Sequence, residues 1–268
     1  MTVPAEVREH WREARVSARA DGLVPALTLL VRALSPGASP RGPRGHAVLP
    51  KELLEEFAAM EAEDARREQQ AEQGTGAGDG ATGDGHERRR LSEFSELKES
   101  RDDDGPVPGL AVLRPGEGDA DAVAGSVSPS ASRDWSTGLA WLRLGVSERL
   151  RDASIAYLAL RQVEGTSLLM QQMVKGALAD VLIEHLEIEG FLDDLADGID
   201  RVAVPLGPRP PIDERELTRL QAQITRADRT LLRLLGAHGF TAEGPGMTAH
   251  ASELLADVYC GGTTEADA

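Results

Sequence analysis

Residues 210–239 read PPIDERELTRLQAQITRADRTLLRLLGAHG, and this stretch decides the fold class of the chain. Its apolar residues recur at alternating spacings of three and four: Leu217, Leu220, Ile224, Ala227, Leu231 and Leu234. That spacing places them on one face of an α-helix of about five turns. Asp213 and Glu216 resemble a capping box at its start, and Gly236 and Gly239 mark its end. The stretch therefore predicts a long amphipathic helix with a wide apolar face to bury.

Three further helical patterns follow residue 134. The first rests on Val146, Leu150, Ala153, Tyr157 and Leu160, the second on Leu169, Met173, Ala177 and Val181, and the last runs from about Thr248 to Tyr259. Ile188, Leu192, Leu195 and Ile199 either extend the second helix past Gly190 or form a separate one. Four helices with wide apolar faces pack most simply as an antiparallel bundle. We therefore predict a mostly α fold, with a four-helix bundle over residues 131–264 in which the Leu169–Val181 and Leu217–Leu234 faces meet.

Residues 1–70 carry two helical patterns of their own. Leu23–Leu34 is apolar, but Pro25 and Arg32 interrupt it and it is shorter than the ~20 residues of a membrane span, so we expect an amphipathic helix. Acidic residues precede it where a secretory signal has cations. The second pattern opens at Pro50 and places Leu53, Leu54, Phe57 and Met60 on one face. We expect an N-terminal helical segment.

Residues 71–130 differ in composition from both flanking regions. Residues 71–106 are poor in hydrophobic residues and rich in glycine and charge, so they cannot bury enough apolar surface to fold, and we expect a disordered linker. The glycines in this stretch have no apolar strand before them and no helix start after them, which argues against a phosphate-binding loop. Val107–Leu113 is long and apolar enough for a short strand. The rest of the region predicts little regular structure.

Charge and composition exclude several classes of function. The chain has 29 Lys plus Arg and 45 Asp plus Glu, a net charge of −16, which repels nucleic acids and anionic membrane surfaces. Cys260 is the single cysteine, so neither an intramolecular disulfide nor a cysteine-cluster zinc site can form, and we expect a reducing, cytoplasmic location. Aromatic residues make up 3%, which argues against an all-β fold.

Few local motifs point to chemistry. His185 lies among Glu184, Glu187 and Glu189, which indicates either a solvated acidic helix face or a carboxylate-rich metal site; the spacing lacks the repeated Glu-x-x-His pattern of a di-iron bundle, so we predict no metal. Cys260, before two glycines, is either a nucleophile at a turn or a small buried hydrophobic residue. No nucleophile elbow of the α/β-hydrolase type occurs.

Two longer segments carry a family resemblance. The first is RQVEGTSLLMQQMVKGALAD at residues 161–180, and the second is LLGAHGFTAEGP at 234–245, continuing to VYCGGT at 258–263. In this order they resemble the C-terminal helical domain of the acyl-CoA dehydrogenases, with its Arg-x-x-Phe-Gly turn, its Leu-Ala-Asp helix, its glycine turn and its Tyr-Glu-Gly-Thr ending. The resemblance covers roughly residues 135–264, about half of the chain.

The resemblance implies a flavoprotein oxidoreductase. Such an enzyme uses FAD to remove hydrogens from the α and β carbons of an acyl-CoA or acyl-carrier thioester, and it forms homo- or hetero-oligomers. By position, Arg161, Gln171 and Gln172 match residues that contact the flavin. Gly236 and Gly239 match the turn that lets a neighbouring subunit's backbone approach the cofactor. From the residues alone, Arg161 is equally well a helix-terminal charge before Gly165, and the two glycines a plain helix cap.

Departures from the family pattern concern the catalytic base. Glu164 stands where the family has a phenylalanine. The position of the family's catalytic glutamate is occupied by Cys260, or by Gly261 if one residue is inserted. The alternative base position, on the first bundle helix, falls on Trp135, with Asp134 one residue away. Asp134 and Cys260 are therefore the only catalytic candidates, and a base must lie within hydrogen-bonding reach of the substrate proton.

Two functions follow from this mixture of matches and departures. A complete family member also has an N-terminal helical domain and a β-domain in a longer chain, so this sequence resembles a truncated or degenerate member. The first hypothesis is a subunit that takes part in dehydrogenation beside a complete partner. The alternative is a non-catalytic helical interaction or assembly module that keeps only the family bundle.

Overall fold

The computed structural model of this chain describes residues 3–36, 39–57, 59–60, 63, 66, 109–113, 129–196, 214–241 and 244–260. The prediction of a mostly α fold is confirmed. The helices are α1 (Ala5–Ala20), α2 (Leu23–Leu34), α6 (Pro129–Leu160), α7 (Gln172–Ala196), α8 (Glu214–Leu235) and α9 (Gly246–Cys260). The expected disordered linker, 71–106, lies outside the described residues. Among the described helices, none combines the length and the apolar character needed to cross a bilayer.

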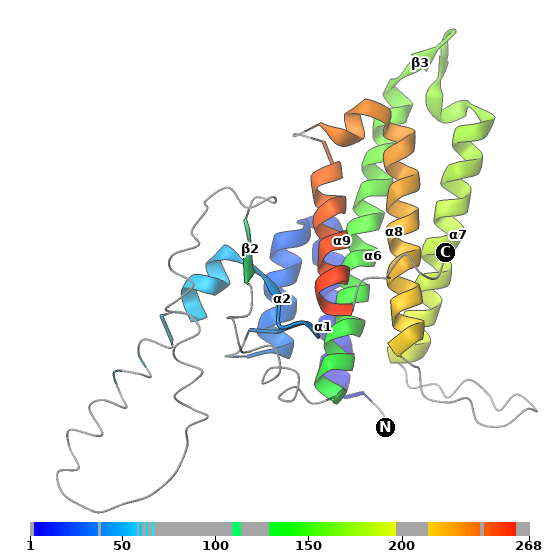
Figure 1. The fold of residues 1–268 in the computed structure, drawn as a ribbon. Helices are drawn as coiled ribbons and strands as arrows, with labels where there is room; N and C mark the ends of the chain where they lie inside the picture. Colours follow the sequence, from blue (N-terminus) through cyan, green and yellow to red (C-terminus); the bar gives the residue numbers. More distant parts are fainter. Residues whose placement is uncertain are drawn as a thin grey trace, which may run out of the picture.

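Helix α6 is the central element of the fold. Every residue from Thr137 to Glu148 is buried, on all sides of the helix. Figure 1 shows why: α7, α8 and α9 run alongside α6, and α1 and α2 cover the lower part of the molecule beside it. A helix surrounded in this way has no solvent face over these turns, so its polar residues must find partners on the neighbouring helices.

Two glycines of α6 allow α1 to approach closely. A Cβ atom on Gly145 would lie 2.3 Å from the carbonyl oxygen of Arg15, and one on Gly138 would lie 2.8 Å from the Trp11 ring. The two positions are seven residues apart and therefore face the same side of α6. Helices α1 and α6 thus pack with their backbones nearly in contact.

The N-terminal helices share one hydrophobic core with α6, α8 and α9. Trp11 and Leu27 are buried in this core together with Trp141 and Leu255. The predicted amphipathic helix over Leu23–Leu34 is confirmed as α2, and residues 51–57 are helical as expected. The predicted domain boundaries at residues 70 and 130 adjoin stretches outside the described residues and stay a prediction.

A small antiparallel sheet closes one side of this core. Strand β1 (Ala47–Pro50) pairs with β2 (Leu110–Leu113), and Ala47 lies opposite Leu113. The strand expected over Val107–Leu113 is therefore found over its described part, Leu110–Leu113. Sequence analysis did not predict β1, which has no polar alternation because all of its residues are buried.

The second predicted bundle helix is continuous. Helix α7 runs through Gly190 to Ala196, so the first of the two alternatives for this region is correct over the described residues. Val181 packs with Leu231 and Leu235 of α8, as expected from the two apolar faces. The expectation is wrong for Met173, which is 85% exposed. One edge of the predicted apolar face is buried and another edge faces solvent.

A hairpin joins α6 to α7 in the region where a helix cap before Gly165 was one of the two interpretations. Strands β3 (Gln162–Val163) and β4 (Thr166–Ser167) pair across a two-residue turn. Both turn residues have positive φ, 54° at Glu164 and 79° at Gly165, as the right-handed twist of a tight hairpin requires. The short 3-10 helix η2 (Leu168–Met170) then leads into α7.

Candidate functional site

The two predicted catalytic residues lie at the same end of the molecule. Asp134 is on the first turns of α6, and Cys260 is the last residue of α9. Their neighbours touch, since the rings of Trp135 and Tyr259 meet edge-on with centroids 5.1 Å apart. Burial raises the pKa of the half-buried Asp134, and Arg133 opposes this rise.

The chain's own N-terminal region fills this end. The Tyr259 hydroxyl accepts a hydrogen bond from the Val48 amide at 2.9 Å and lies 3.0 Å from the Val48 carbonyl oxygen, to which it donates. A Cβ atom on Gly42 would lie 1.8 Å from the Val258 carbonyl oxygen, so the segment is pressed against α9. The space beside Tyr259 is therefore occupied by backbone that satisfies the tyrosine, not by a substrate cavity.

The predicted flavin-contacting residues lie at the opposite end, on the surface. Arg161, Gln171 and Gln172 are exposed around the hairpin between α6 and α7. Arg161 donates to the Tyr157 hydroxyl at 3.0 Å, and its guanidinium lies 5.6 Å from the centre of that ring. This placement fits the interpretation of Arg161 as a charge at the end of a helix, since α6 ends at Leu160.

The predicted glycine turn lies near Arg161. Gly236 has a φ of +58° and opens the 3-10 helix η3 (Gly236–Phe240), which also contains the buried Gly239. His238 of this turn stacks on Tyr157, with ring centroids 4.2 Å apart and planes at 8°. The cavity beside the turn, of about 280 Å³, is lined by α6, η3 and α9 residues and not by Arg161, Gln171 or Gln172. These residues, as placed in one chain, do not enclose a flavin.

One chain does not bring the two predicted sets of residues together. Asp134 and Arg161 stand near opposite ends of α6, about 40 Å apart at about 1.5 Å per residue. Cys260 lies with Asp134, and Gly236 lies with Arg161. The geometry therefore gives no single active site built from these candidates.

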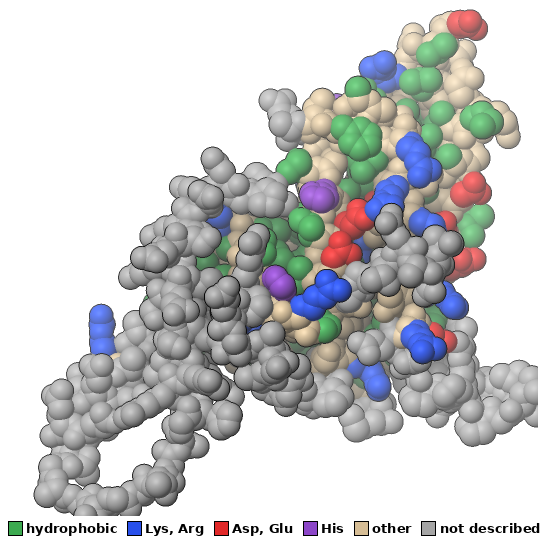
Figure 2. Space-filling view, in the orientation of Figure 1, with side chains coloured by type: hydrophobic (Ala, Val, Ile, Leu, Met, Phe, Trp, Pro, Cys, Tyr) green, Lys and Arg blue, Asp and Glu red, His purple; other side chains and the backbone are tan. Residues whose placement is uncertain are grey.

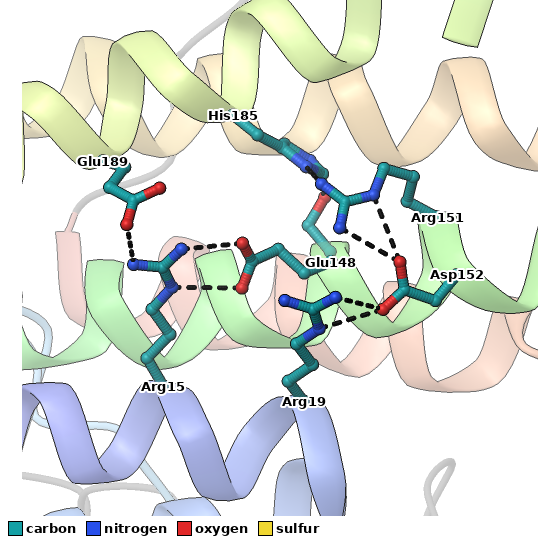
Figure 3. A network of polar contacts seen from close by, with 8 residues as sticks. Arg15, Arg19, Glu148, Arg151, Asp152, His185 and Glu189 are labelled. Atoms are coloured by element: carbon teal, nitrogen blue, oxygen red, sulfur yellow. Dashed lines mark hydrogen bonds and ion pairs between the residues drawn. The ribbon is translucent and has the colours of Figure 1, made fainter.

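A network of buried charges instead holds α1, α6 and α7 together (Figure 3). Arg15 of α1 donates to both carboxylate oxygens of Glu148 on α6, at 2.7 and 3.0 Å, and to Glu189 on α7 at 2.6 Å. Burial disfavours the Arg15 charge, but the two glutamates outweigh it and raise the pKa of Arg15 above its usual value. The Arg15 hydrogen bond in turn lowers the pKa of Glu189.

His185 belongs to the same network and points inward (Figure 3). Its Nε2 lies 2.9 Å from Ser147 Oγ, and Arg151 Nη1 lies 3.2 Å from its Nδ1. Because a guanidinium only donates, Nδ1 accepts and Nε2 carries the proton that it donates to Ser147. Burial and then Arg151 lower the pKa of His185 to about 4, so the ring is neutral. The interpretation of His185 as part of a solvated face is thus wrong; in the described part of the chain, no group of His, Cys, Asp and Glu is arranged to hold a metal ion.

A second buried polar cluster joins α6 to α8 and α9. Arg143 is fully buried and donates to Gln221 Oε1 at 2.6 Å, Thr225 Oγ1 at 2.8 Å and Ser252 Oγ at 3.0 Å. Asp228 is buried nearby, and no hydrogen-bond partner reaches either of its carboxylate oxygens among the described residues. Burial raises the pKa of Asp228 to about 7, although the nearby Ser147 hydroxyl and Arg143 guanidinium oppose the rise.

The outer face of α7 is apolar and uncovered. Along it, five small or aliphatic residues recur at spacings of three and four: Gly176, Ala179, Ile183, Leu186 and Gly190. Ile183 is 54% exposed and Leu186 is 58% exposed, and nothing lies within 4 Å of a Cβ atom built on either glycine. In Figure 2, hydrophobic and acidic side chains lie together along the edge of the molecule where α7 runs. We call these five residues the α7 outer face.

Comparison with known proteins adds no family assignment. No protein-family model matches the sequence, and no curated protein matches it either. The acyl-CoA dehydrogenase resemblance therefore stays a hypothesis that rests on the motifs of residues 161–180 and 234–263. The geometry of the described residues carries the functional argument.

Sequence analysis missed the residues that the structure singles out. Arg143 interrupts the apolar run LAWLRLGV at residues 139–146, and an arginine inside such a run was a usable sign of a buried polar cluster. Asp228 occurs between two apolar positions of its helix, Ala227 and Leu231, which was a weaker sign. The pairing of Arg15 with Glu148 had no local signal, because it joins helices far apart in sequence.

We expect Arg15→Met to lower the free energy of unfolding by about 3–5 kcal/mol, since it leaves the Glu148 carboxylate buried without its partner. Arg12→Met is the matched control, because Arg12 also joins α1 to α7, through Asp193, but both side chains are more than two-fifths exposed. The control should cost less than about 1 kcal/mol. Urea denaturation of the two variants measures the difference, and equal losses would contradict the buried network.

We expect Asp228→Asn to stabilise the protein at about pH 8. Asp228 has a pKa of about 7 in the folded state, whereas its ordinary pKa of 3.8 applies in the unfolded state, so the parent loses stability as the pH rises between these values. The gain should reach up to about 4 kcal/mol, at about 1.4 kcal/mol per pKa unit, and should shrink toward pH 4. Thermal melts across this range test it against the exposed control Asp180→Asn. A gain that does not depend on pH would show that Asp228 is not protonated in this way.

Proposed function

We propose that this chain is a helical interaction module that binds a partner protein through the α7 outer face. This proposal rests on one observation: a long, well-packed helix has an exposed apolar surface, with Ile183 and Leu186 at its middle. Soluble chains rarely leave such a face open without a partner for it. The module rests on an antiparallel four-helix bundle of α6 to α9 similar to the acyl-CoA dehydrogenase C-terminal domain. Support for the bundle is that α6 contacts α7, α8 and α9, and that α8 contacts both α7 and α9.

The spacing on the α7 outer face suits another helix. Residues that repeat every three and four positions form the seam of a helix pair, in which side chains of one helix fill holes in the other. Gly176 and Gly190 lie at the two ends of this seam, inside the helix, where glycine is unfavourable by about 1 kcal/mol relative to alanine. A partner helix whose backbone approaches closely at these two positions would explain why they are glycines, since nothing in the isolated chain requires a residue without a side chain there.

Charge beside the seam defines the partner's chemistry. Asp180, Glu184 and Glu187 form an acidic row along one edge of the α7 outer face. A second copy of this chain, which carries a net charge of −16, would bring a further acidic row against it. The surface therefore fits an amphipathic helix with an apolar stripe and flanking lysine or arginine residues.

We expect a synthetic helix of about three heptads, with Ala and Leu at the a and d positions and Lys at the e and g positions, to bind the full chain. Ile183→Asp should weaken binding by at least about tenfold and change the melting temperature little, since the side chain is more than half exposed. Val16→Asp is the matched control, because it makes the same kind of change at an aliphatic residue of α1 that is 66% exposed. Fluorescence anisotropy of the labelled peptide gives both affinities.

A matched peptide with Glu in place of Lys should not bind. Equal binding of the two peptides, or equal affinities for Ile183→Asp and Val16→Asp, would contradict the proposed surface. If the parent sediments as a dimer and Ile183→Asp as a monomer, the face belongs to a second copy and the basic partner is wrong.

FAD-linked dehydrogenation beside a complete partner subunit is the second candidate function. It is supported by the placement of Arg161 and Gly236 at one exposed end of the molecule, open to a neighbouring subunit. Since these residues do not enclose a flavin alone, we expect the purified chain to be colourless after incubation with FAD and desalting. Retained flavin absorbance that Arg161→Ala abolishes, and that the exposed control Arg219→Ala keeps, would instead favour a flavoprotein.

A further inference from the structure

Asp228 of α8 is a carboxyl group enclosed between α6, α8 and α9. The residue is 4% exposed, and both of its oxygens are fully buried. A nearby hydroxyl, on Ser147 of α6, accepts a hydrogen bond from His185 and keeps its own proton available to Asp228. Arg143 of α6 also lies nearby, but it donates to other residues of α8 and α9. Protein atoms, and not solvent, therefore surround this carboxyl group.

Charged and titratable groups face Asp228 from each of the helices around it. They are Arg143 on α6, His185 on α7 through Ser147, Arg229 on α8 itself, and Glu253, Asp257 and His250 on α9. Burial is the largest influence and raises the pKa of Asp228 to about 7; Glu253 adds to the rise, whereas Ser147 and Arg143 oppose it. His185 is neutral because its pKa is lowered to about 4, and Arg229 is paired with Glu253. Asp228 therefore gains its charge near neutral pH, inside the protein and away from water.

The two halves of α9 are held differently against the rest of the chain. At its C-terminal end, the Tyr259 hydroxyl bonds to the amide and carbonyl groups of Val48, and in its middle Ser252 accepts from α6. Before Ser252, a cavity of about 320 Å³ lies between α9, α8 and η3, with Met247 in its wall. Figure 1 shows this half of α9 at the end of the helix that lies near η3. The segment Gly246–Ala251 therefore has open space on its α8 side.

We propose that ionisation of Asp228 opens the first turns of α9, Gly246–Ala251, so that water fills the cavity and reaches the carboxylate. A buried carboxylate without water or a sufficient partner is costly, and hydration removes most of that cost. Local openings of this kind occur where a segment has little packing to lose. The ion pair that joins this part of α9 to α8, Arg229–Glu253, is partly exposed and restrains the segment weakly. This pH-sensitive opening does not depend on the partner proposed for the α7 outer face.

Native-state hydrogen exchange of the full chain at about pH 6 and about pH 8 tests this opening, because these values lie on either side of the pKa of Asp228. In the open form the carboxylate regains its ordinary pKa of 3.8. Proton linkage then predicts that the amides of Ala249, His250 and Ala251 lose protection by about tenfold from the lower to the higher pH, after correction for intrinsic exchange. At low urea concentrations these amides should lack the urea dependence of the buried α6 amides, since a local opening exposes little surface.

Two variants assign the response to one residue. Asp228→Asn stays neutral at both pH values and should keep the protection of these amides constant; we expect it to fold because it places no charge in the core. His250→Gln is the matched control, because it removes the histidine that lines the same cavity, and it should keep the tenfold response of the parent.

Equal protection of the three amides at the two pH values, or an equal loss in Asp228→Asn, would overturn the proposal. A loss with the full urea dependence of the α6 amides would also overturn it, since the chain would then unfold as a whole. Disappearance of the response in His250→Gln would assign it to that histidine and not to Asp228.

Discussion

The complete burial of α6 between Thr137 and Glu148 is the constraint on which the positions of the other helices depend. This segment contains polar side chains that would cost several kcal/mol without partners. Each partner comes from a different helix: Glu148 accepts from Arg15 of α1, Ser147 pairs with His185 of α7, and Arg143 donates to α8 and α9. Since apolar packing tolerates small rotations and hydrogen bonds do not, these contacts fix the register of the surrounding helices.

The same constraint explains why α7 presents an open face. Its inner side is occupied by the polar contacts of His185 and Glu189 and by the apolar contacts of Val181. These contacts hold one side of the helix against α1, α6 and α8, which leaves the α7 outer face without a neighbour in the described part of the chain. The contacts that stabilise the fold and the surface proposed for binding therefore lie on different sides of one helix. A substitution on the outer side is therefore expected to have little effect on folding, since Ile183 and Leu186 are more than half exposed.

The sequence predicts local features of this molecule well and distant ones poorly. The helix over residues 214–235 follows from the spacing of its own apolar residues and from the glycine that follows it at position 236; the predicted cap, Asp213, lies outside the described residues. The spacing over Leu169–Val181 also reveals apolar residues, but it cannot say which neighbour covers them, and Met173 is left exposed. The distance between Asp134 and Arg161 could have been predicted from the sequence, because one helical stretch connects them and its length sets their distance. The contact of Val48 with Tyr259 could not have been predicted in this way, because it joins residues more than two hundred positions apart.

Hydrogen bonding within the chain accounts for the end of the molecule where the resemblance suggests a catalytic site. At the end where the family resemblance places catalysis, the buried Tyr259 hydroxyl is fully used by Val48, and the chain fills the space around it. Between α6 and α8 a buried carboxylate, Asp228, lies in the core beside Arg143, and burial raises its pKa to about 7. The resemblance thus directs attention to one end of the bundle, whereas the buried Asp228 and the exposed apolar α7 outer face lie elsewhere in the structure.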